Sequence, residues 1–442
     1  MKLFDVYPLY DVTPVSAKGI VVTDDKGQEY LDFYGGHAVI SIGHSHPHYI
    51  KRLKDQLDNI GFYSNSVKNP LQEELAEKLG RLSGCEDYDL FLCNSGAEAN
   101  ENALKMASFH TGKSRVIAFE NSFHGRTSAA VAVTDNPKIN APINRQQKVT
   151  FLPFDDVEAL RTEVEKGDVC AVILEAVQGV GGLDQPSTEF YRELERVCRE
   201  HGVVLIADEV QSGFGRTGKF FAFQHFAGPA QNTDLDKQKD STARIDSESP
   251  APSAGEFGKI SPDIISIAKG MGNGFPVGGI LIHKDIKASY GLLGTTFGGN
   301  HLACAATLAV LEVLEKERLI ENAQRLEGYF RALAADIPQI KKVKGRGLML
   351  GLEFKNEAES KVTGLAAIES GTSLEVGELR KRLIHNQFLF TGGAKNKHVL
   401  RVLPALNITE TDLDVFFERL KAELETMSKQ IQSSAEPLNN EK

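Results

Sequence analysis

The chain has 442 residues, of which 41% are hydrophobic and 25% charged, as in an ordinary soluble globular protein. This length predicts two domains, or one large domain with a smaller one, because it exceeds what a single simple core accommodates. The formal net charge of −10, without a local basic cluster, argues against a nucleic-acid partner. No apolar run approaches membrane-spanning length, and the opening MKLFDVYPLYDV lacks a signal pattern.

The cysteines also indicate the class of protein. They are odd in number, unclustered and mostly within apolar runs: Cys85, Cys93, Cys170, Cys198 and Cys304. This pattern predicts reduced side chains in the core, and argues against a disulfide framework or a zinc site. We therefore expect a cytoplasmic protein.

The N-terminal segment, residues 1–50, contains GIVVTDDKGQEYLDF, which predicts a hairpin over residues 19–33. From about residue 86, short apolar runs alternate with amphipathic stretches. The runs are YDLFLC, RVIAF, VTFLPF, VCAVILEAV, GVVLIA and DIISIA, and the helical patterns include AEANENALKMASFH and TEFYRELERVCREH. This alternation predicts an α/β fold with a mainly parallel sheet and helices on both faces.

These patterns divide the chain into expected domains. Residues 51–300 form the large domain, with a polar mobile insertion at 228–258, and residues 301–427 form a smaller C-terminal α/β domain that the N-terminal segment joins. Residues 355–374 are a second, less distinct insertion, and residues 428–442 are expected to be a flexible tail.

The candidate site residues follow the ends of the apolar runs, where the crevice of a parallel sheet forms. Lys269 ends PDIISIAKG, and a buried amine there would lose its proton readily and attack a carbonyl. We interpret that carbonyl as the aldehyde of pyridoxal phosphate, with Asp208 as the partner of the pyridinium nitrogen and Gln211 of the ring phenolate. The neighbours Glu209 and Val210 complete this cofactor-binding segment, DEVQ. Taken singly, such residues are more often solvated residues at a strand end.

Other segments supply the remaining parts of such a site. In NSGAEAN, Ser95, Gly96 and Ala97 open a helix whose amide groups can hold a phosphate. In FHGRT, Phe123 could stack on a flat ring and Arg126 could bind a carboxylate. In GTTFGGN, Thr295 and Thr296 could donate hydroxyls to a phosphate. The ordinary alternatives are a capped helix, a core Phe beside a surface Arg, and a plain turn.

Two further motifs carry no such prediction. HSHPH places His44, His46 and His48 at alternate positions, but no carboxylate or Cys completes a local metal pattern, so we expect them to cap and pack near the domain junction and predict no metal. QGVGG at 178–182 lacks the glycine spacing of a dinucleotide fingerprint.

Taken together, NSGAEAN, FHGRT, LIADEVQSGFGRTG, AKGMGNGFPVGG and TTFGGNHLACAA resemble, in order, the fold-type I, class III aminotransferases that use pyridoxal phosphate. The resemblance is closest to the acetylornithine and succinylornithine aminotransferases of arginine biosynthesis. It implies that Lys269 bonds to the cofactor and moves the proton, and that Thr296 contacts the phosphate of the neighbouring subunit in a homodimer with shared active sites. Thr295 and Arg126 match substrate-side positions, and Arg401 matches the arginine that holds the α-carboxylate.

The resemblance implies transfer of the terminal amino group of an N-acylated ornithine to 2-oxoglutarate, with no nucleic-acid or membrane partner. The alternatives are an ornithine δ-aminotransferase or another ω-amino acid aminotransferase, an aminomutase and, more remotely, a non-catalytic relative. One departure bears on this choice, because the family commonly has Glu where Val180 stands in QGVGG. Burying Arg401 without that partner costs free energy, so we expect another carboxylate to pair with it. We hypothesise that a substrate carboxylate does so in both half-reactions and that the donor is acylated, with N-succinylornithine as one candidate.

Overall fold

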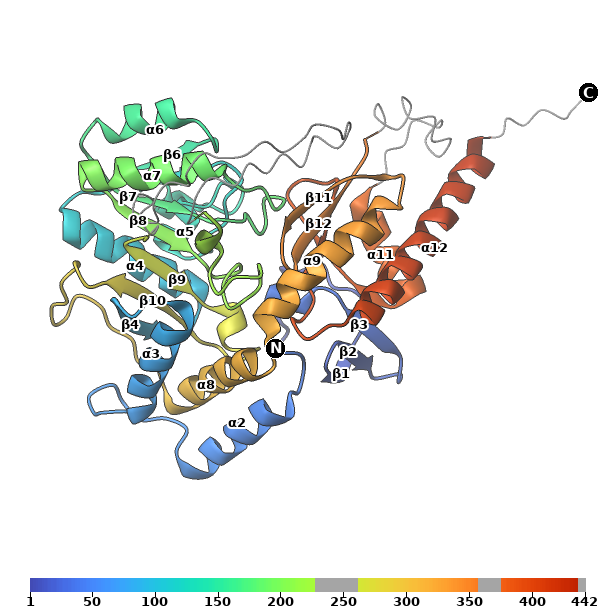
Figure 1. Ribbon diagram of the computed structural model, residues 1–442, viewed down its shortest axis with the longest axis horizontal. Coiled ribbons are helices and arrows are strands. Elements are labelled where there is room, and N and C mark those ends of the chain that lie inside the picture. Colours follow the sequence, from blue (N-terminus) through green and yellow to red (C-terminus); the bar gives the residue numbers. More distant parts are fainter. Residues whose placement is uncertain (227–260, 357–374, 436–442) are drawn as a thin grey trace, which may run out of the picture.

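The computed structural model of the protein describes residues 1–226, 261–356 and 375–435. Figure 1 shows two lobes, one around a large sheet and one that combines the N-terminal strands with the C-terminal third of the chain. The expected insertion at 228–258 lies outside the described residues. Of the expected insertion at 355–374, the part after residue 356 also lies outside them.

A seven-stranded sheet forms the centre of the large lobe. Its strands, in spatial order, are β4 (Tyr88–Cys93), β10 (Gly278–His283), β9 (Ile264–Ile267), β8 (Val204–Asp208), β7 (Val169–Leu174), β5 (Arg115–Phe119) and β6 (Val149–Leu152). Strand β10 runs antiparallel to β4 and β9, and the other strands of this sheet are parallel to one another. The six apolar runs of the sequence are these parallel strands, which confirms the expected mainly parallel α/β fold. The predicted runs omit β10, whose sequence GGILIH is short and begins with two glycines.

Helices cover both faces of this sheet (Figure 1). They are α3 (Pro70–Ser83), α4 (Gly96–Thr111), α5 (Ser128–Ala132), α6 (Val157–Val164) and α7 (Thr188–His201). In β5, Val116 and Ala118 pack in one core cluster with α4, whereas Ile117 and Phe119 pack in another with α7. Strands covered on both faces read as continuous apolar runs instead of alternating ones, as found in the sequence.

The smaller lobe contains two four-stranded sheets. One has the order β11 (Ile340–Arg346), β12 (Met349–Phe354), β15 (Val399–Val402), β14 (Gly392–Gly393), and the other β1 (Pro14–Lys18), β2 (Val21–Asp24), β3 (Glu29–Asp32), β13 (Leu389–Phe390). The predicted hairpin is formed by the antiparallel strands β2 and β3. Strand β3 pairs in parallel with β13, which places the N-terminal strands in one sheet with a strand from the C-terminal part of the chain.

The remaining elements flank or connect these sheets. They are α1 (Gly35–Ala38), α2 (Pro47–Asn59), α8 (His301–Lys316), α9 (Leu319–Ala335), α11 (Val376–Gln387), α12 (Glu410–Ala435) and the short 3-10 turns η1 (Pro142–Asn144), η2 (Ala222–His225) and η3 (Lys269–Met271). Helix α12 continues to Ala435, past residue 427 where we expected the ordered chain to end, and residues 436–442 lie outside the described residues.

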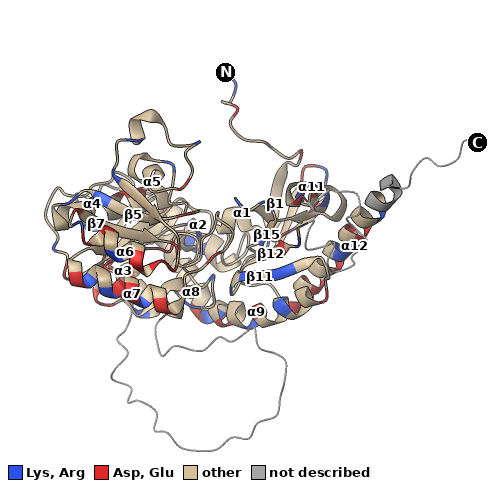
Figure 2. Ribbon diagram, turned by 90° about the horizontal axis from the view of Figure 1, so that it is seen from above, with Lys and Arg blue, Asp and Glu red and all other residues tan. Residues whose placement is uncertain are grey.

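Charged residues lie mainly on the outer helices. Figure 2 shows basic and acidic positions interspersed along α3, α7 and α9, and basic positions along strand β11. In the part of the chain that the structure describes, no helix combines the length and apolar character that a bilayer span requires. All five cysteines are buried, as the sequence predicts.

A fully buried arginine links the two lobes. Arg216, in the loop after β8, donates hydrogen bonds to the carbonyl oxygens of Ile40 (3.0 Å), Leu348 (3.4 Å) and Pro404. Burial lowers its pKa to about 10, partly opposed by the negative charge of Asp32. Because these carbonyls come from three distant segments, one side chain fixes the N-terminal turn and the C-terminal sheet against the large lobe.

We predict that Arg216→Met lowers the free energy of unfolding by about 3 kcal/mol, because it leaves buried carbonyl oxygens without donors. Urea unfolding followed by circular dichroism measures this. The control Arg318→Met removes an exposed arginine paired with Glu321 and should cost at most about 0.5 kcal/mol. Equal unfolding midpoints for the two variants would show that Arg216 does not hold the lobes together.

Candidate active site

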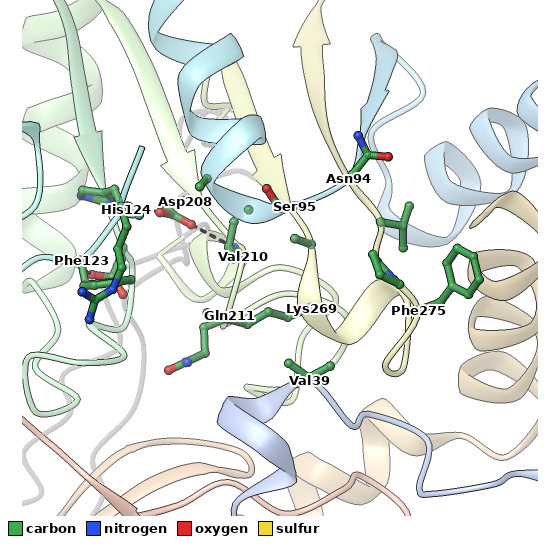
Figure 3. A pocket seen from close by; sticks show the side chains of 18 of the residues that line it. Val39, Asn94, Ser95, Phe123, His124, Asp208, Val210, Gln211, Lys269 and Phe275 are labelled. Atoms are coloured by element: carbon green, nitrogen blue, oxygen red, sulfur yellow. Dashed lines mark hydrogen bonds and ion pairs between the residues drawn. The ribbon is translucent and has the colours of Figure 1, made fainter. Parts of the chain in front are cut away.

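A cavity of about 400 Å³ lies beyond the carboxyl ends of the parallel strands. The segments that follow β4, β5, β7, β8 and β9 all contribute to its walls, together with Val39 from the N-terminal turn and the 274–277 loop. Figure 3 shows Lys269 and Gln211 between the strand end that carries Asp208 and the turn that carries Val39. This convergence is what a parallel sheet provides at that edge.

Lys269 lies at the end of β9, where the chain enters the turn η3. Its φ of 47° is in the left-handed region, which is uncommon for a residue with a side chain. Burial lowers the pKa of its amine, while the negative charges of Asp208 and Glu175 oppose that shift. The net direction favours the neutral, nucleophilic form.

Asp208 ends β8 and is held by three donors. Its Oδ2 accepts from Nδ1 of His124 (2.7 Å) and Nδ2 of Asn100 (2.8 Å), and its Oδ1 accepts from the amide of Val210 (3.0 Å). The residue is 4% exposed and lines the cavity. These hydrogen bonds fix the direction of the carboxylate in a buried setting.

The N-terminus of α4 also faces the cavity. Ser95 caps this helix by accepting the Glu98 amide at 3.2 Å, and Gly96 and Ala97 follow it on the cavity wall. A Cβ on Gly96 would lie 2.5 Å from Cγ1 of Val210, so glycine is needed where the two segments meet. The first amide groups of a helix attract an anion, which supports the interpretation of this segment as a phosphate site.

Three more predicted residues line the same cavity: Phe123, Arg126 and Gln211. Nε2 of Gln211 donates to the carbonyl of His37 at 3.2 Å, and its Oε1 is buried without a partner among the described residues. The guanidinium of Arg126 lies 6.0 Å from the ring centroid of Phe123 and is exposed. The cavity therefore offers an aromatic wall, a cation and an unsatisfied amide oxygen.

Other predicted residues lie away from this cavity. The Glu209 carboxylate faces the opposite way, accepting the Ser212 hydroxyl at 2.6 Å and the amides of residues 222 and 223. Thr295 accepts the Gly298 amide at 3.0 Å, and Thr296 is exposed. Neither threonine lines the cavity within one chain.

Arg401 lies on β15 and reaches toward the loop after β7. It donates to the carbonyl oxygens of Gly179 (2.8 Å) and Gly393, and its guanidinium lies 5.9 Å from the Tyr34 ring centroid. Burial lowers its pKa. Val180 brings no charge, and no carboxylate of the described chain forms an ion pair with Arg401. Within the described residues, carbonyl oxygens and an aromatic face contact the guanidinium instead, and the hypothesis that a substrate carboxylate pairs with it stays a prediction.

The sequence interpretation missed two cavity residues, Glu175 and His124. Glu175 directly follows β7 and accepts the amides of Phe123 and Gly179, each at 2.8 Å. Burial raises its pKa. The sequence held a signal for Glu175, because an acidic residue directly after the apolar run VCAVIL lies at a strand end. It held no such signal for His124, whose role becomes visible only through its contact with Asp208, although the residue lies inside FHGRT.

The histidines of HSHPH pair with three separate carboxylates. His44 contacts Asp32 at 2.9 Å and His46 contacts Glu317 at 3.0 Å, whereas His48 contacts Glu312. Within residues 1–226, 261–356 and 375–435, no group of three or more His, Cys, Asp or Glu side chains is arranged to hold a metal ion.

Comparison with known proteins places this site in a family. The sequence model described as aminotransferase class-III matches residues 6–235 and 254–424. The acetylornithine aminotransferase of Bacillus subtilis is 36% identical over 431 residues, covering 95% of this chain and 97% of that protein. That of Methanosarcina acetivorans is 38% identical over 342 residues, covering 76% and 78%.

A solved structure shows the same fold. The ornithine aminotransferase from Toxoplasma gondii superimposes with a TM-score of 0.78 at 26% identity, covering 96% of this chain and 92% of that one, and in that structure PLP partly occupies the active site. The architecture is therefore that of the fold-type I transferases, as predicted. With the sequence match over most of its length, the chain belongs to the class-III aminotransferase family, which confirms the resemblance.

The raised pKa of Glu209 generates a prediction. Burial raises it to about 7, so the folded protein binds this proton more tightly than the unfolded chain does. The resulting stabilisation is complete below about pH 4.5 and is lost as pH rises through about 7, a change of roughly 3 kcal/mol. We predict that Glu209→Gln unfolds with a flatter dependence on pH between 5 and 8 than the wild type.

Urea unfolding at four pH values in that window measures this difference. Glu200→Gln, at an exposed position of α7, is the control and should follow the wild type. Curves for wild type and Glu209→Gln that stay parallel would contradict the shift.

Proposed function

We propose that this chain uses pyridoxal phosphate to move the terminal amino group of an N-acylated ornithine to 2-oxoglutarate, giving the semialdehyde and glutamate. The observation that carries the proposal is the meeting of three groups in one cavity: the buried amine of Lys269, the buried carboxylate of Asp208 and the N-terminus of α4. An amine nucleophile, an anion facing a ring nitrogen and a phosphate site are the requirements of this cofactor.

The residues present fit the cofactor. The amides after Ser95 would hold the phosphate, Phe123 would cover one face of the ring and Asp208 would pair with the pyridinium nitrogen. The side-chain amide of Gln211 lies at the cavity wall, where its Nε2, which donates to the carbonyl of His37 in this structure, would donate to the ring phenolate. When bound, the cofactor supplies an electron sink for the carbon next to the transferred amine.

The chain's own groups then have distinct tasks. Nζ of Lys269 would take the proton from the donor carbon that bears the amino group and, once protonated, would deliver it as a general acid to the carbon of the cofactor that receives the amino group. Burial lowers the pKa of this amine, a shift toward the neutral form that a base requires. Asp208, held by His124 and Asn100, keeps its charge and direction during this transfer.

Arg401 supports the choice of substrate. Both the donor and 2-oxoglutarate carry carboxylates, and we propose that a substrate carboxylate pairs in each half-reaction with this guanidinium, which has no carboxylate partner in the described chain. Arg126 and Thr295 are proposed to contact the rest of the substrate. The relatives at 36% and 38% identity are named for acetylornithine, whereas ornithine δ-transamination, the activity in the name of the Toxoplasma gondii structure, is the alternative.

The active form is proposed to be a homodimer with shared sites. Thr296 is exposed in one chain, consistent with a phosphate contact across the subunit interface. We place the enzyme in the cytoplasm, a location that suits its five buried cysteines.

A donor panel tests the reaction. With 2-oxoglutarate as acceptor, we expect glutamate formation from N-acetylornithine or N-succinylornithine with kcat/KM at least about tenfold above that for free ornithine. Lys269→Ala should abolish turnover and the near-visible absorbance of the bound cofactor. Borohydride reduction of the wild type followed by peptide mass analysis should label position 269. Equal use of free ornithine would contradict the acylated donor, and a label elsewhere would contradict the cofactor assignment.

We predict that Asp208→Asn lowers kcat by at least about a hundredfold, since a neutral amide no longer holds the ring nitrogen protonated. Cofactor content, read from absorbance after alkaline release, should fall less than the rate. Asp168→Asn, at the far end of the sheet where Asp168 pairs with Arg115 at 2.8 Å, is the control. Near wild-type turnover by Asp208→Asn would remove Asp208 from the chemistry.

A further inference from the structure

A carboxylate in the wall of the active-site cavity has no task in the proposed chemistry. Glu175 directly follows β7, is 6% exposed and lines the same cavity as Lys269. Its Oε1 accepts the amide N–H of Phe123, and its Oε2 accepts that of Gly179, each at 2.8 Å. Both oxygens are therefore engaged, one by the loop after β5 and the other by the loop after β7.

These two contacts favour the ionised form of Glu175. A carboxylate accepts both N–H groups, whereas a protonated carboxyl would turn its O–H toward one of them. Burial raises the pKa of the group, because an anion inside the protein is unfavourable unless cations lie nearby. Arg401 and Lys269 are cations of the same site, and neither forms an ion pair with a carboxylate of the described chain.

Arg401 is linked to Glu175 through one residue. Its Nη1 donates to the carbonyl oxygen of Gly179 at 2.8 Å, and the amide of Gly179 donates to Glu175. The position of Gly179 is restricted from another side, since a Cβ built on it would lie 2.1 Å from Oε1 of Gln211. Burial lowers the pKa of Arg401, and the negative charge of Glu175 is one of those that oppose this shift. The carboxylate thus acts on the guanidinium through both the Gly179 backbone and its charge.

Lys269 is the second cation on which the charge of Glu175 acts. Burial lowers the pKa of the lysine amine, and the charges of Asp208 and then Glu175 oppose that shift. Asp208 already has a side-chain partner in His124, at 2.7 Å. Both hydrogen-bond partners of Glu175, by contrast, are neutral backbone amides, so its charge remains available to the lysine.

The segment around Gly179 offers no other free carboxylate within its described residues. Glu175 and Asp184 are the acidic residues of the range 175–184, and Asp184 pairs with Lys344 at 2.5 Å. Val180, directly after Gly179, brings no charge. The negative charge with which this loop balances a nearby guanidinium therefore has to come from Glu175.

We propose that Glu175 is a positioning residue whose carboxylate serves both cations: it holds Arg401 in place through the Gly179 backbone and supports the charged form of Lys269 through space. The inference rests on the proposed function only for the tasks of those two cations. A lysine that has to take up and release a proton needs such a balance between burial and charge. A carboxylate that merely anchored two loops would make the same hydrogen bonds, but it would not change how Lys269 titrates.

Titration of Lys269 tests the charge of Glu175. The full-length chain, freed of cofactor, is labelled with a trace of acetic anhydride between about pH 7 and pH 11, and peptide mass analysis reads the acetylation of position 269. Glu175→Gln keeps the size of the side chain but removes its charge. The lysine should then lose its proton, and react, at a pH lower by about half a unit or more. Glu175→Asp retains the charge and should titrate as the wild type does.

Glu209→Gln is the matched control. Glu209 is also buried and also accepts two backbone amides, those of residues 222 and 223, but it faces away from the cavity. Its substitution should leave the titration of Lys269 as in the wild type. The other charged or titratable groups around the lysine are unchanged in all these variants: Asp208, His124, Arg126, Arg401 and His37.

A double-mutant cycle tests the link to Arg401. Thermal unfolding midpoints are compared for Glu175→Gln, Arg401→Met and the double variant of the full-length chain. The double variant should lose less than the sum of the two single losses, because each single change leaves the other charge without its partner. The losses of Glu209→Gln and Arg401→Met should be additive.

Four results would each overturn the assignment: an unchanged Lys269 titration in Glu175→Gln, the same shift in Glu209→Gln, a displaced titration in Glu175→Asp, or additive losses for Glu175 and Arg401. A lower stability of Glu175→Gln without the two expected effects would reduce Glu175 to an anchor of two loops. Neither measurement uses a substrate or the cofactor. Failure of the donor panel therefore counts against the proposed function alone, whereas the labelling and the cycle decide the role of Glu175.

Discussion

The structure depends on burying an amine and two carboxylates at one edge of a sheet. Asp208 and Glu175 are buried and Lys269 is partly buried, and the three lie close enough for the charges of the two carboxylates to act on the lysine. Burying such a cluster costs free energy unless every charged group has a hydrogen-bond or ion-pair partner. Asp208 has three donors and Glu175 has two backbone amides. Burial nevertheless lowers the pKa of the lysine, a shift toward the neutral form that a nucleophile and proton carrier requires.

The parallel sheet explains how residues so distant in sequence share this environment. Each contributes from the first positions after a strand, where the chain leaves the sheet and backbone geometry is no longer fixed by pairing. At Lys269 the chain takes a left-handed conformation, and at Gly96 a side chain is excluded by Val210. Local backbone geometry that an isolated segment would avoid is maintained by the surrounding packing.

The sequence predicted the parts of the site that lie in strand ends and a helix start, because burial there leaves a readable pattern. The continuous apolar runs gave the parallel strands, and the glycine and serine after YDLFLC gave the start of α4. It could not predict that Glu209 turns away while its neighbour Asp208 turns in, since alternate positions after a strand look alike. Nor could it show that His124 holds Asp208, a contact between segments 84 positions apart.

The contacts of the Arg401 guanidinium bear on substrate specificity. Where a protein carboxylate pairs with such an arginine, substrate binding must first break that ion pair. The two substrates of a ping-pong cycle can then be distinguished by whether they break it. Here backbone carbonyls hold the guanidinium, and they leave its net charge uncancelled. If Arg401 binds a substrate carboxylate as proposed, this contact does not by itself distinguish one donor from another. Discrimination would then have to come from groups that contact the rest of the donor.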